Sequence, residues 1–172
     1  MARDGGLRLR LGVRGIVSEH VAIRRGAAAD RPFVLELGQR TALDSVSALR
    51  TAAPQALARS YEQLVDVVFA RSHVLAIAED PLAGPVGFAL MLDDLPDEVT
   101  GDDQGFVAYM AVEPHARRAG VGRRLLAAVE AVARERGLPY AALMVTEDNA
   151  AARELYASAG YVTERRLLCK RL

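Results

Sequence analysis

The sequence predicts a single α/β sandwich domain built on a mixed sheet. Three observations support this fold class. About half of the residues (51%) are hydrophobic, which is enough to bury a sizeable core in a chain of 172 residues. Strand-like and helix-like patterns follow one another from residue 20 onward without repeats or linkers. The strongest pattern, at residues 105–136, is an apolar strand that passes through a glycine-containing turn into an amphipathic helix.

The first half of the domain is expected to contain a strand, two helices and a hairpin. A strand at residues 20–25 leads into a helix at residues 31–40, which Asp30 can cap. After a connector, Pro54 opens a second helix. Its apolar face comprises Leu57, Tyr61, Leu64, Val65, Val68 and Phe69. The strands of the hairpin that follows span residues 74–78 and 86–92.

The second half is expected to complete the sheet. Gly137 ends the helix that follows the glycine-containing turn, as glycine commonly does at a helix C-terminus. Asp148 or Asn149 caps a further helix, which ends at Gly160. The remaining strands are predicted at residues 140–145, 161–163 and 166–170, the last two as a closing hairpin.

The first 19 residues are interpreted as an N-terminal arm or an extra edge strand. Leu7, Leu9, Leu11 and Val13 alternate with arginine and glycine at the period of a strand. The segment lacks the continuous apolar run of a secretory signal, and its two acidic residues set it apart from a mitochondrial presequence.

The turn before the central helix carries charges of the wrong sign for a helix N-terminus. Four arginines surround it, namely Arg117, Arg118, Arg123 and Arg124, and no acidic residue occurs between residues 114 and 129. Because the first backbone N–H groups of a helix carry partial positive charge, this arrangement favours a bound anion. Gly120 and Gly122 would let backbone amides approach a phosphate group. The alternative is a solvated basic turn that only joins strand to helix.

Two common nucleotide-binding loops do not match this turn. It lacks the Gly-Lys-Ser/Thr ending of a nucleoside-triphosphate loop, and Leu125 replaces the third glycine of a dinucleotide fingerprint. Strand, turn and helix together resemble motif A of the GNAT superfamily of N-acetyltransferases. Residues 149–161 resemble motif B of the same family, with Asn149, Ala152, Tyr156, Gly160 and Tyr161 in register. The resemblance covers residues 20–172.

This resemblance implies a fold, a co-substrate and the residues that bind it. The sheet would be mostly antiparallel, splayed at its middle strands and flanked by helices on both faces. Acetyl-CoA would lay its pantetheine arm along Met110, Ala111 and Val112, beside Asn149 and Ala152. Its pyrophosphate would meet the loop residues Arg117, Arg118, Ala119, Gly120, Val121, Gly122 and Arg123. Tyr156 would line the same site and, as general acid, protonate the departing thiolate.

The general base is the point at which the sequence departs from the family pattern. Many members carry a glutamate at the position of Phe106. Three weaker candidates remain, namely Tyr109, Glu147 and, through a water molecule, Asp103. Deprotonating a lysine-like amine at pH 7 costs about 4.6 kcal/mol, whereas an α-amine with a pKa near 8 costs about 1.4 kcal/mol. The easier acceptor is therefore a primary amine of low pKa, on a small molecule or a protein N-terminus.

Charge patterns bear on the partners of the chain. The connector at residues 93–103 is acidic and could attract a cationic amine, although runs of like charge are usually solvated loops. Its acidic residues are Asp93, Asp94, Asp97, Glu98, Asp102 and Asp103. A nucleic-acid-binding domain is disfavoured, because 22 basic and 22 acidic residues balance and no aromatic residue interleaves the arginines. A catalytically silent acyl-CoA-binding module remains the alternative to an enzyme.

Composition also bears on metal sites and membranes. A single cysteine, Cys169, and three histidines argue against a zinc site, and Cys169 is expected in the core. No apolar stretch approaches the 18 residues of a transmembrane helix. We therefore expect a cytoplasmic protein without a metal, a membrane or a nucleic-acid partner, and leave open whether it forms a homodimer.

Overall fold

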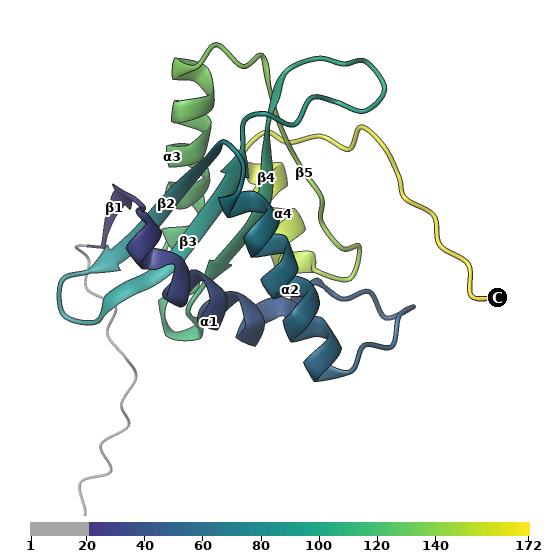
Figure 1. Ribbon diagram of the computed structural model, residues 1–172, viewed down its shortest axis with the longest axis horizontal. Helices are drawn as coiled ribbons and strands as arrows, with labels where there is room; N and C mark the ends of the chain where they lie inside the picture. Colours follow the sequence, from purple (N-terminus) through teal and green to yellow (C-terminus); the bar gives the residue numbers. More distant parts are fainter. Residues whose placement is uncertain (1–20) are drawn as a thin grey trace, which may run out of the picture.

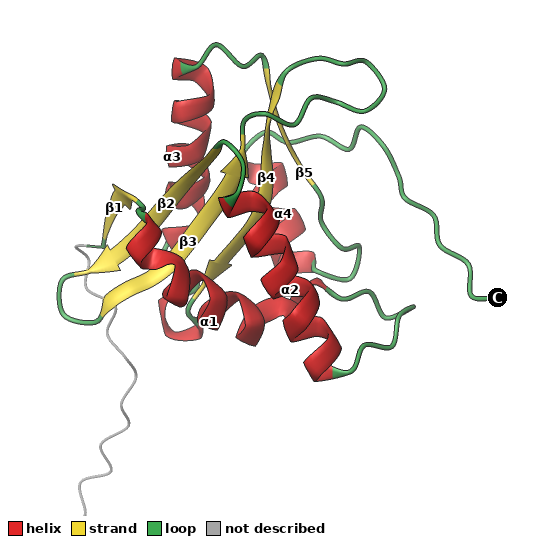
Figure 2. Ribbon diagram, in the orientation of Figure 1, coloured by secondary structure: helices red, strands yellow, loops and turns green. Residues whose placement is uncertain are grey.

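The computed structural model describes residues 21–172, which form a five-stranded sheet with helices on both faces (Figures 1 and 2). The strands lie in chain order: β1 (Ala22–Arg25), β2 (His73–Asp80), β3 (Gly84–Leu92), β4 (Gln104–Val112) and β5 (Tyr140–Leu143). The first four pair antiparallel, whereas β5 runs parallel to β4. The predicted α/β class and mostly antiparallel sheet are confirmed. The predicted N-terminal arm, residues 1–19, lies outside the described residues.

The helices divide into two layers. Helices α1 (Arg31–Thr41) and α2 (Pro54–Phe69) cover one face of the sheet, and α3 (Val121–Glu135) and α4 (Ala150–Ser158) lie behind the other (Figure 1). Short 3₁₀ helices are present at η1 (Ala28–Asp30), η2 (Ala42–Ser45) and η3 (Pro114–Ala116). None of the described helices combines the length and apolar character that crossing a bilayer requires.

Alternation along the strands builds two cores. On β2, Leu75 and Ile77 belong to the cluster formed with α1 and α2. Their neighbours Val74, Ala76 and Ala78 belong to the cluster formed with α3. Successive strand residues point to opposite faces, so one strand serves both layers.

Both ends of α3 follow the local signals in the sequence. Gly120 immediately precedes the helix with φ of 76°, a left-handed conformation that favours glycine. At the other end Gly137 has φ of 73°, and the Leu138 N–H donates to the Ala133 carbonyl at 3.0 Å. This bond closes the C-terminal turn in the manner expected of a glycine stop.

Asp30 does not cap α1, although the helix starts where predicted. Its carboxylate accepts hydrogen bonds from the Arg24 guanidinium at 2.7 and 2.9 Å and from the Ala27 N–H at 2.8 Å. No side-chain hydrogen bond reaches the first amides of α1. The Arg24 guanidinium holds the pKa of Asp30 below its usual range. The capping prediction is wrong because an arginine on β1 competes for the carboxylate.

The predicted closing hairpin is also absent. The described chain contains no strand after β5, and Leu167 and Leu168 are each 88% exposed. Cys169 is exposed rather than in the core. Residues 161–172 contain no glycine, proline, asparagine or aspartate, the residues that tight hairpin turns favour. Strand β5 ends at Leu143 instead of Val145, because β4 and β5 separate there.

Candidate active site

A hollow opens where the two parallel strands separate. Strands β4 and β5 pair from Gln104 with Tyr140 to Val107 with Leu143. Beyond this point they enclose a hollow of about 150 Å³. Its walls come from residues 107–110 of β4, residues 144–146 after β5, and the N-terminal half of α4 with Tyr156. A water molecule occupies roughly 30 Å³, so the hollow has room for a narrow chain or a small acyl group.

A β-bulge shapes the β4 wall of this hollow. Leu90 of β3 faces Tyr109, while the next residue, Met91, faces Val107, so Ala108 is an extra residue on β4. A bulge leaves backbone groups outside the regular ladder and re-aims the neighbouring side chains. Ala108 lines the hollow, where its backbone can meet a bound carbonyl group. The apolar run of β4 contained no signal for this bulge.

The loop before α3 forms a set of unpaired backbone donors. Arg118 and Gly120 have φ of 66° and 76°, and no acidic residue occupies the first turn of α3. Within the described chain, the N–H groups of residues 118–123 make no hydrogen bond. Consecutive N–H groups at a helix N-terminus form an anion site. This cradle suits the diphosphate of a coenzyme.

The two glycines of this loop have different roles. A Cβ on Gly120 would meet nothing within 4 Å, so the positive φ alone requires glycine there. A Cβ on Gly122 would lie 3.2 Å from the Leu155 side chain. Gly122 therefore allows close packing of α4 on α3, a reason different from the predicted approach of an anion.

Two of the four arginines hold neighbouring segments in place. Arg117 donates to the Val112 carbonyl at 3.0 Å and to the Asp44 carboxylate at 3.1 Å. Arg123 donates to the Ser158 hydroxyl at 3.0 Å. The side chain of Arg118 is 83% exposed and lies 3.8 Å from Glu154. Of these three, Arg118 is the most accessible to a bound anion.

Tyr156 and Asn149 meet at the α4 wall of the hollow. Burial raises the pKa of the Tyr156 hydroxyl above that of an ordinary phenol, which is already protonated at neutral pH. Asn149 caps α4, accepting a hydrogen bond from the Ala152 N–H at 3.1 Å. Its amide also donates to the Asp44 carbonyl at 3.2 Å. A pantetheine arm would have to compete with Asp44 for this donor.

The three base candidates lie in different places. Tyr109 lines the hollow, but its hydroxyl donates to the Gly38 carbonyl at 3.4 Å and burial raises its pKa. Glu147 is exposed and pairs with Arg153 at 3.1 Å. Asp103 is exposed and precedes β4, whereas the hollow begins at Val107. The structure thus brings Tyr109 to the hollow with Met110, Asn149, Ala152 and Tyr156, and leaves Glu147 and Asp103 outside it.

The connector after α1 closes one side of the hollow, where Ser45 lines it. The Thr146 hydroxyl donates to the Ser45 carbonyl at 2.5 Å, and the Asp148 carboxylate accepts from the Ala48 N–H at 2.9 Å. These bonds hold the connector after α1 against the loop after β5. They join residues about 100 positions apart in sequence, and no local pattern marks either partner.

The comparisons agree with this geometry. A family model described as "Acetyltransferase (GNAT) family" matches residues 43–161. The chain belongs to this family. GNAT proteins use acetyl-CoA as the acyl donor, and the cradle and the hollow of this chain fit its diphosphate and its narrow pantetheine arm. No group of three or more His, Cys, Asp or Glu in the described part of the chain could hold a metal ion.

Solved structures share the fold at low sequence identity. An acetyl transferase from Pyrococcus furiosus is 21% identical, with a TM-score of 0.76 over 88% of this chain and 99% of that one. A ribosomal-protein-alanine N-acetyltransferase from Brucella melitensis biovar Abortus 2308 is 22% identical, with a TM-score of 0.65 and coverages of 88% and 99%. AAC(6')-Iy, in complex with a CoA-S-monomethyl-acetylneamine bisubstrate analogue, is 19% identical, with a TM-score of 0.63 and coverages of 89% and 98%. A comparison with curated protein sequences gave no match.

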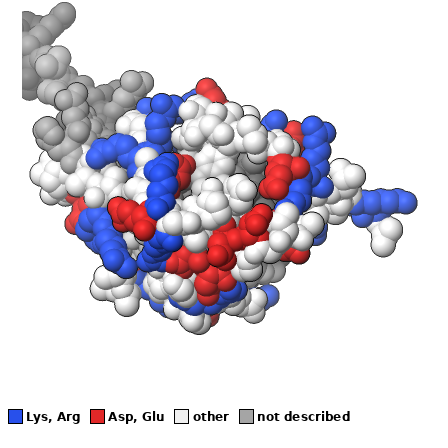
Figure 3. Space-filling view, turned by 90° about the horizontal axis from the view of Figure 1, so that it is seen from above, with Lys and Arg blue, Asp and Glu red and all other residues white. Residues whose placement is uncertain are grey.

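The acidic connector of this GNAT domain is largely paired. Asp93 pairs with Arg136, Asp94 with Arg71, and Asp97 and Glu98 with Arg165. Figure 3 shows acidic and basic side chains interleaved on one face of the molecule. These arginines reduce the field that the connector could exert on a cationic amine, because opposite charges at contact largely cancel at a distance.

Proposed function

We propose that this chain is an acetyl-CoA-dependent N-acetyltransferase. It would transfer an acetyl group to a primary amine, on a small molecule or a protein N-terminus, by direct attack of the amine on the thioester. The observation that carries this proposal is the hollow between β4 and β5, with the Tyr156 phenol in its wall. Two structural neighbours act on amines by name, a ribosomal-protein-alanine N-acetyltransferase and an AAC(6') enzyme bound to an acetylneamine conjugate. Their identity is too low to fix the acceptor.

The cradle before α3 and the wall of β4 would position the donor. The N–H groups of residues 118–123 would bind the diphosphate, and residues Met110 to Val112 would border the pantetheine arm. When bound, acetyl-CoA supplies the thioester. The backbone of the bulge residue Ala108 would bond the thioester carbonyl, an interaction that strengthens as negative charge develops on its oxygen.

Tyr156 would supply the proton for the departing thiolate. Its hydroxyl is protonated at neutral pH, as an ordinary phenol is, and a general acid needs that proton before transfer. Tyr109 is a poor base, because burial raises its pKa and its hydroxyl already donates to the Gly38 carbonyl. We therefore assign Tyr109 to positioning, and Tyr156 to proton donation.

The amine would reach the site already neutral. No carboxylate of the described residues lines the hollow. The proton of the ammonium form would therefore pass to water before attack. This route favours acceptors of low pKa, because the neutral form of an α-amine is far more abundant at pH 7 than that of a lysine side chain.

The test is release of coenzyme A thiol from acetyl-CoA across a panel of amines. For the best acceptor, Tyr156→Phe should lower kcat by about 100-fold or more, as loss of a general acid does, with acetyl-CoA affinity unchanged. Tyr161→Phe is the matched control: its ring packs on Tyr156 at 5.9 Å, yet it lies outside the hollow. Equal rates for the two variants would remove Tyr156 from the chemistry.

A catalytically silent acyl-CoA-binding module is the alternative, and the hollow without a carboxylate favours it. This alternative predicts that calorimetry detects acetyl-CoA binding while no amine releases thiol. Absence of acetyl-CoA binding would overturn both proposals.

A further inference from the structure

Asp44 joins the coenzyme site to the segment that follows α1, which we call the α1–α2 connector (residues 42–53). The Arg117 guanidinium donates to the Asp44 carboxylate at 3.1 Å, and the Asn149 amide donates to the Asp44 carbonyl at 3.2 Å. Arg117 begins the loop before α3, and Asn149 lines the hollow. Asp44 therefore holds two groups that a bound coenzyme would also contact.

The α1–α2 connector forms part of the wall of the hollow. Ser45 lines the hollow, and its carbonyl accepts from the Thr146 hydroxyl at 2.5 Å. The Asp148 carboxylate accepts from the Ala48 N–H at 2.9 Å. Because Asp44 directly precedes Ser45, losing the two contacts of Asp44 would remove restraints from this wall. The position of the wall thus depends on groups in the coenzyme site.

A bound diphosphate would take Arg117 from Asp44. The side chains of Asp44 and Arg117 are 55% and 45% exposed, and water weakens an ion pair at this exposure. The diphosphate and the Asp44 carboxylate carry charge of the same sign, so they repel one another at a shared guanidinium. The diphosphate also gains the N–H groups of the cradle, whereas Asp44 binds only the side chain of Arg117 in this loop.

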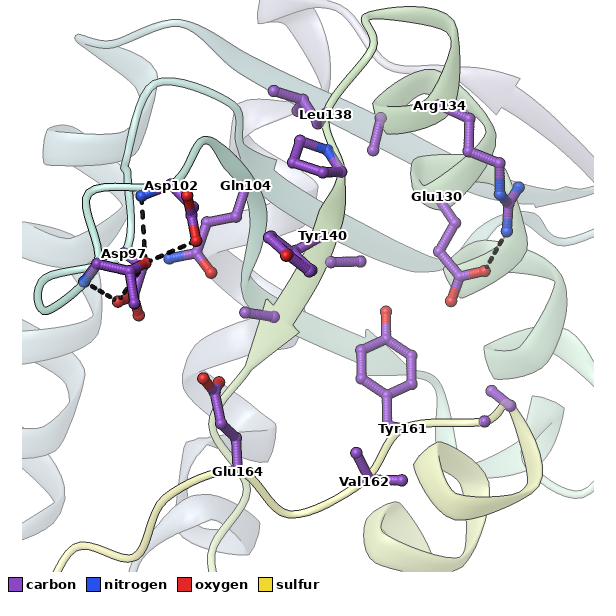
Figure 4. A pocket seen from close by; sticks show the side chains of 17 residues that line it. Asp97, Asp102, Gln104, Glu130, Arg134, Leu138, Tyr140, Tyr161, Val162 and Glu164 are labelled. Carbon is purple, nitrogen blue, oxygen red and sulfur yellow. Dashed lines mark hydrogen bonds and ion pairs between the residues drawn. The ribbon is translucent and has the colours of Figure 1, made fainter.

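The larger groove of the described chain offers no such link. This groove of about 600 Å³ lies beside β5, and Figure 4 shows the side chains that line it. Carboxylates in it have partners of their own: Glu130 pairs with Arg134, and Asp97 with Arg165. Its lining includes no residue of the loop before α3 or of the α1–α2 connector. Among the ion pairs of the described residues, only that of Asp44 joins these two segments.

We propose that Asp44 competes with bound acetyl-CoA for Arg117 and Asn149, so that coenzyme binding releases the α1–α2 connector. The competition rests on the proposed binding of acetyl-CoA at the cradle. Asp44 is a positioning residue, because it acts through Arg117 and Asn149. Without coenzyme, Asp44 holds the connector against the hollow. With coenzyme bound, the connector is loosened, and the wall beside Ser45 opens where the amine is acetylated.

Calorimetry of acetyl-CoA binding tests the competition. Asp44→Asn should lower Kd about three- to five-fold, because Arg117 no longer has an exposed carboxylate as its partner. Asp44→Glu retains the carboxylate and should keep the native Kd. Asp148→Asn is the matched control, since it removes an exposed carboxylate that ties the same connector but does not contact Arg117. It should leave Kd unchanged.

A double-mutant cycle separates competition from the general effect of charge. In a chain with Arg117→Gln, Asp44→Asn should leave Kd unchanged, because the competitor acts through the guanidinium that has been removed. If the charge of Asp44 only repelled the diphosphate from a distance, the tighter binding would persist in this chain. Its persistence would therefore overturn the proposal.

Amide hydrogen exchange reports the release of the connector without turnover. Acetyl-CoA should slow exchange in residues 118–123, where it binds, and speed exchange at least about two-fold in residues 42–50. In Asp44→Asn, residues 42–50 should exchange at the faster rate before acetyl-CoA is added, with little further change. Asp148→Asn should also speed exchange there, yet keep the response to acetyl-CoA.

The outcomes distinguish this competition from the proposed function. Equal Kd for the native chain and Asp44→Asn, or slower exchange of residues 42–50 in the complex, would overturn the competition while amine acetylation stands. Tighter binding by Asp44→Asn and faster exchange, with no thiol released by any amine, would support the competition and leave the silent module. Absence of acetyl-CoA binding to the native chain would reject both.

Discussion

Gly38→Ala should destabilise the native protein but stabilise a variant in which Tyr61 is replaced by leucine. Gly38 lies in α1, and a Cβ there would stand 2.0 Å from both Cζ and Oη of Tyr61 on α2. That ring is buried and fixed, because its hydroxyl donates to the Val34 carbonyl at 3.1 Å. It also packs on Tyr109, with ring centroids 4.7 Å apart. The ring therefore cannot withdraw without disturbing the wall of the hollow.

The magnitude follows from two opposing terms. Overpacking a core costs about 1–3 kcal/mol, whereas alanine gains roughly 0.5–1 kcal/mol over glycine inside a helix. Gly38→Ala should therefore lower the free energy of unfolding of the native protein by about 0–2.5 kcal/mol, the difference of the two terms, and toward the upper end because the contact is as short as 2.0 Å. With Tyr61→Leu the outer ring atoms are gone, and the same change should raise it by about 0.5–1 kcal/mol.

Urea unfolding of the four chains in this cycle measures the coupling. Tyr61→Phe is the internal control, because it removes Oη but retains Cζ at the same 2.0 Å, so Gly38→Ala should remain destabilising there. If Gly38→Ala changed the stability by the same amount with tyrosine and with leucine at position 61, the steric argument would be refuted. Gly38→Ala should also lower the acetylation rate, but only when Tyr61 is present. The displaced Tyr61 ring would then shift Tyr109, which packs on it and lines the hollow.

Three further predictions concern pH, charge and backbone conformation. In the pH profile of kcat/KM, the acidic limb should have a midpoint that follows the pKa of each amine tested. A midpoint that is the same for all amines would instead indicate a base on the enzyme. Asp30→Asn should cost about 1–2 kcal/mol at pH 7. Because Arg24 lowers the folded-state pKa of Asp30, this difference in unfolding free energy should shrink as pH falls below the unfolded pKa and vanish through the folded one; a difference that stays constant down the acid titration would contradict the linkage. Gly120→Ala should lower the stability of the protein by about 1 kcal/mol, because φ is 76° at this position, and Gly120→Asn should lower it by less. Equal melting temperatures for the two variants would contradict the claim that the positive φ requires glycine.

Local patterns accounted for most of the fold. The ends of α3 were predictable because glycines mark positive φ, and Pro54 marks the start of α2. The strands β2 to β4 were predictable because buried strands need continuous apolar residues. The prediction of a closing hairpin was wrong because a strand-like pattern does not specify which strand it pairs with. In the described chain, the apolar residues near the C-terminus have no partner strand.

The sequence by itself determined the family, the glycine-containing turn before α3 and the positions of Asn149 and Tyr156 on α4, because motifs and periodicity are properties of neighbouring residues. Only the tertiary structure decided which groups meet at the hollow. The Ala108 bulge arises from pairing with β3, and the Ser45–Thr146 bond joins distant segments. Burial by other elements raises the pKa of Tyr109. The arginines that pair with the acidic connector follow α2, α3 and α4 in the chain, namely Arg71, Arg136 and Arg165. Burial and charge pairing depend on contacts between residues far apart along the chain, which no reading of consecutive residues contains.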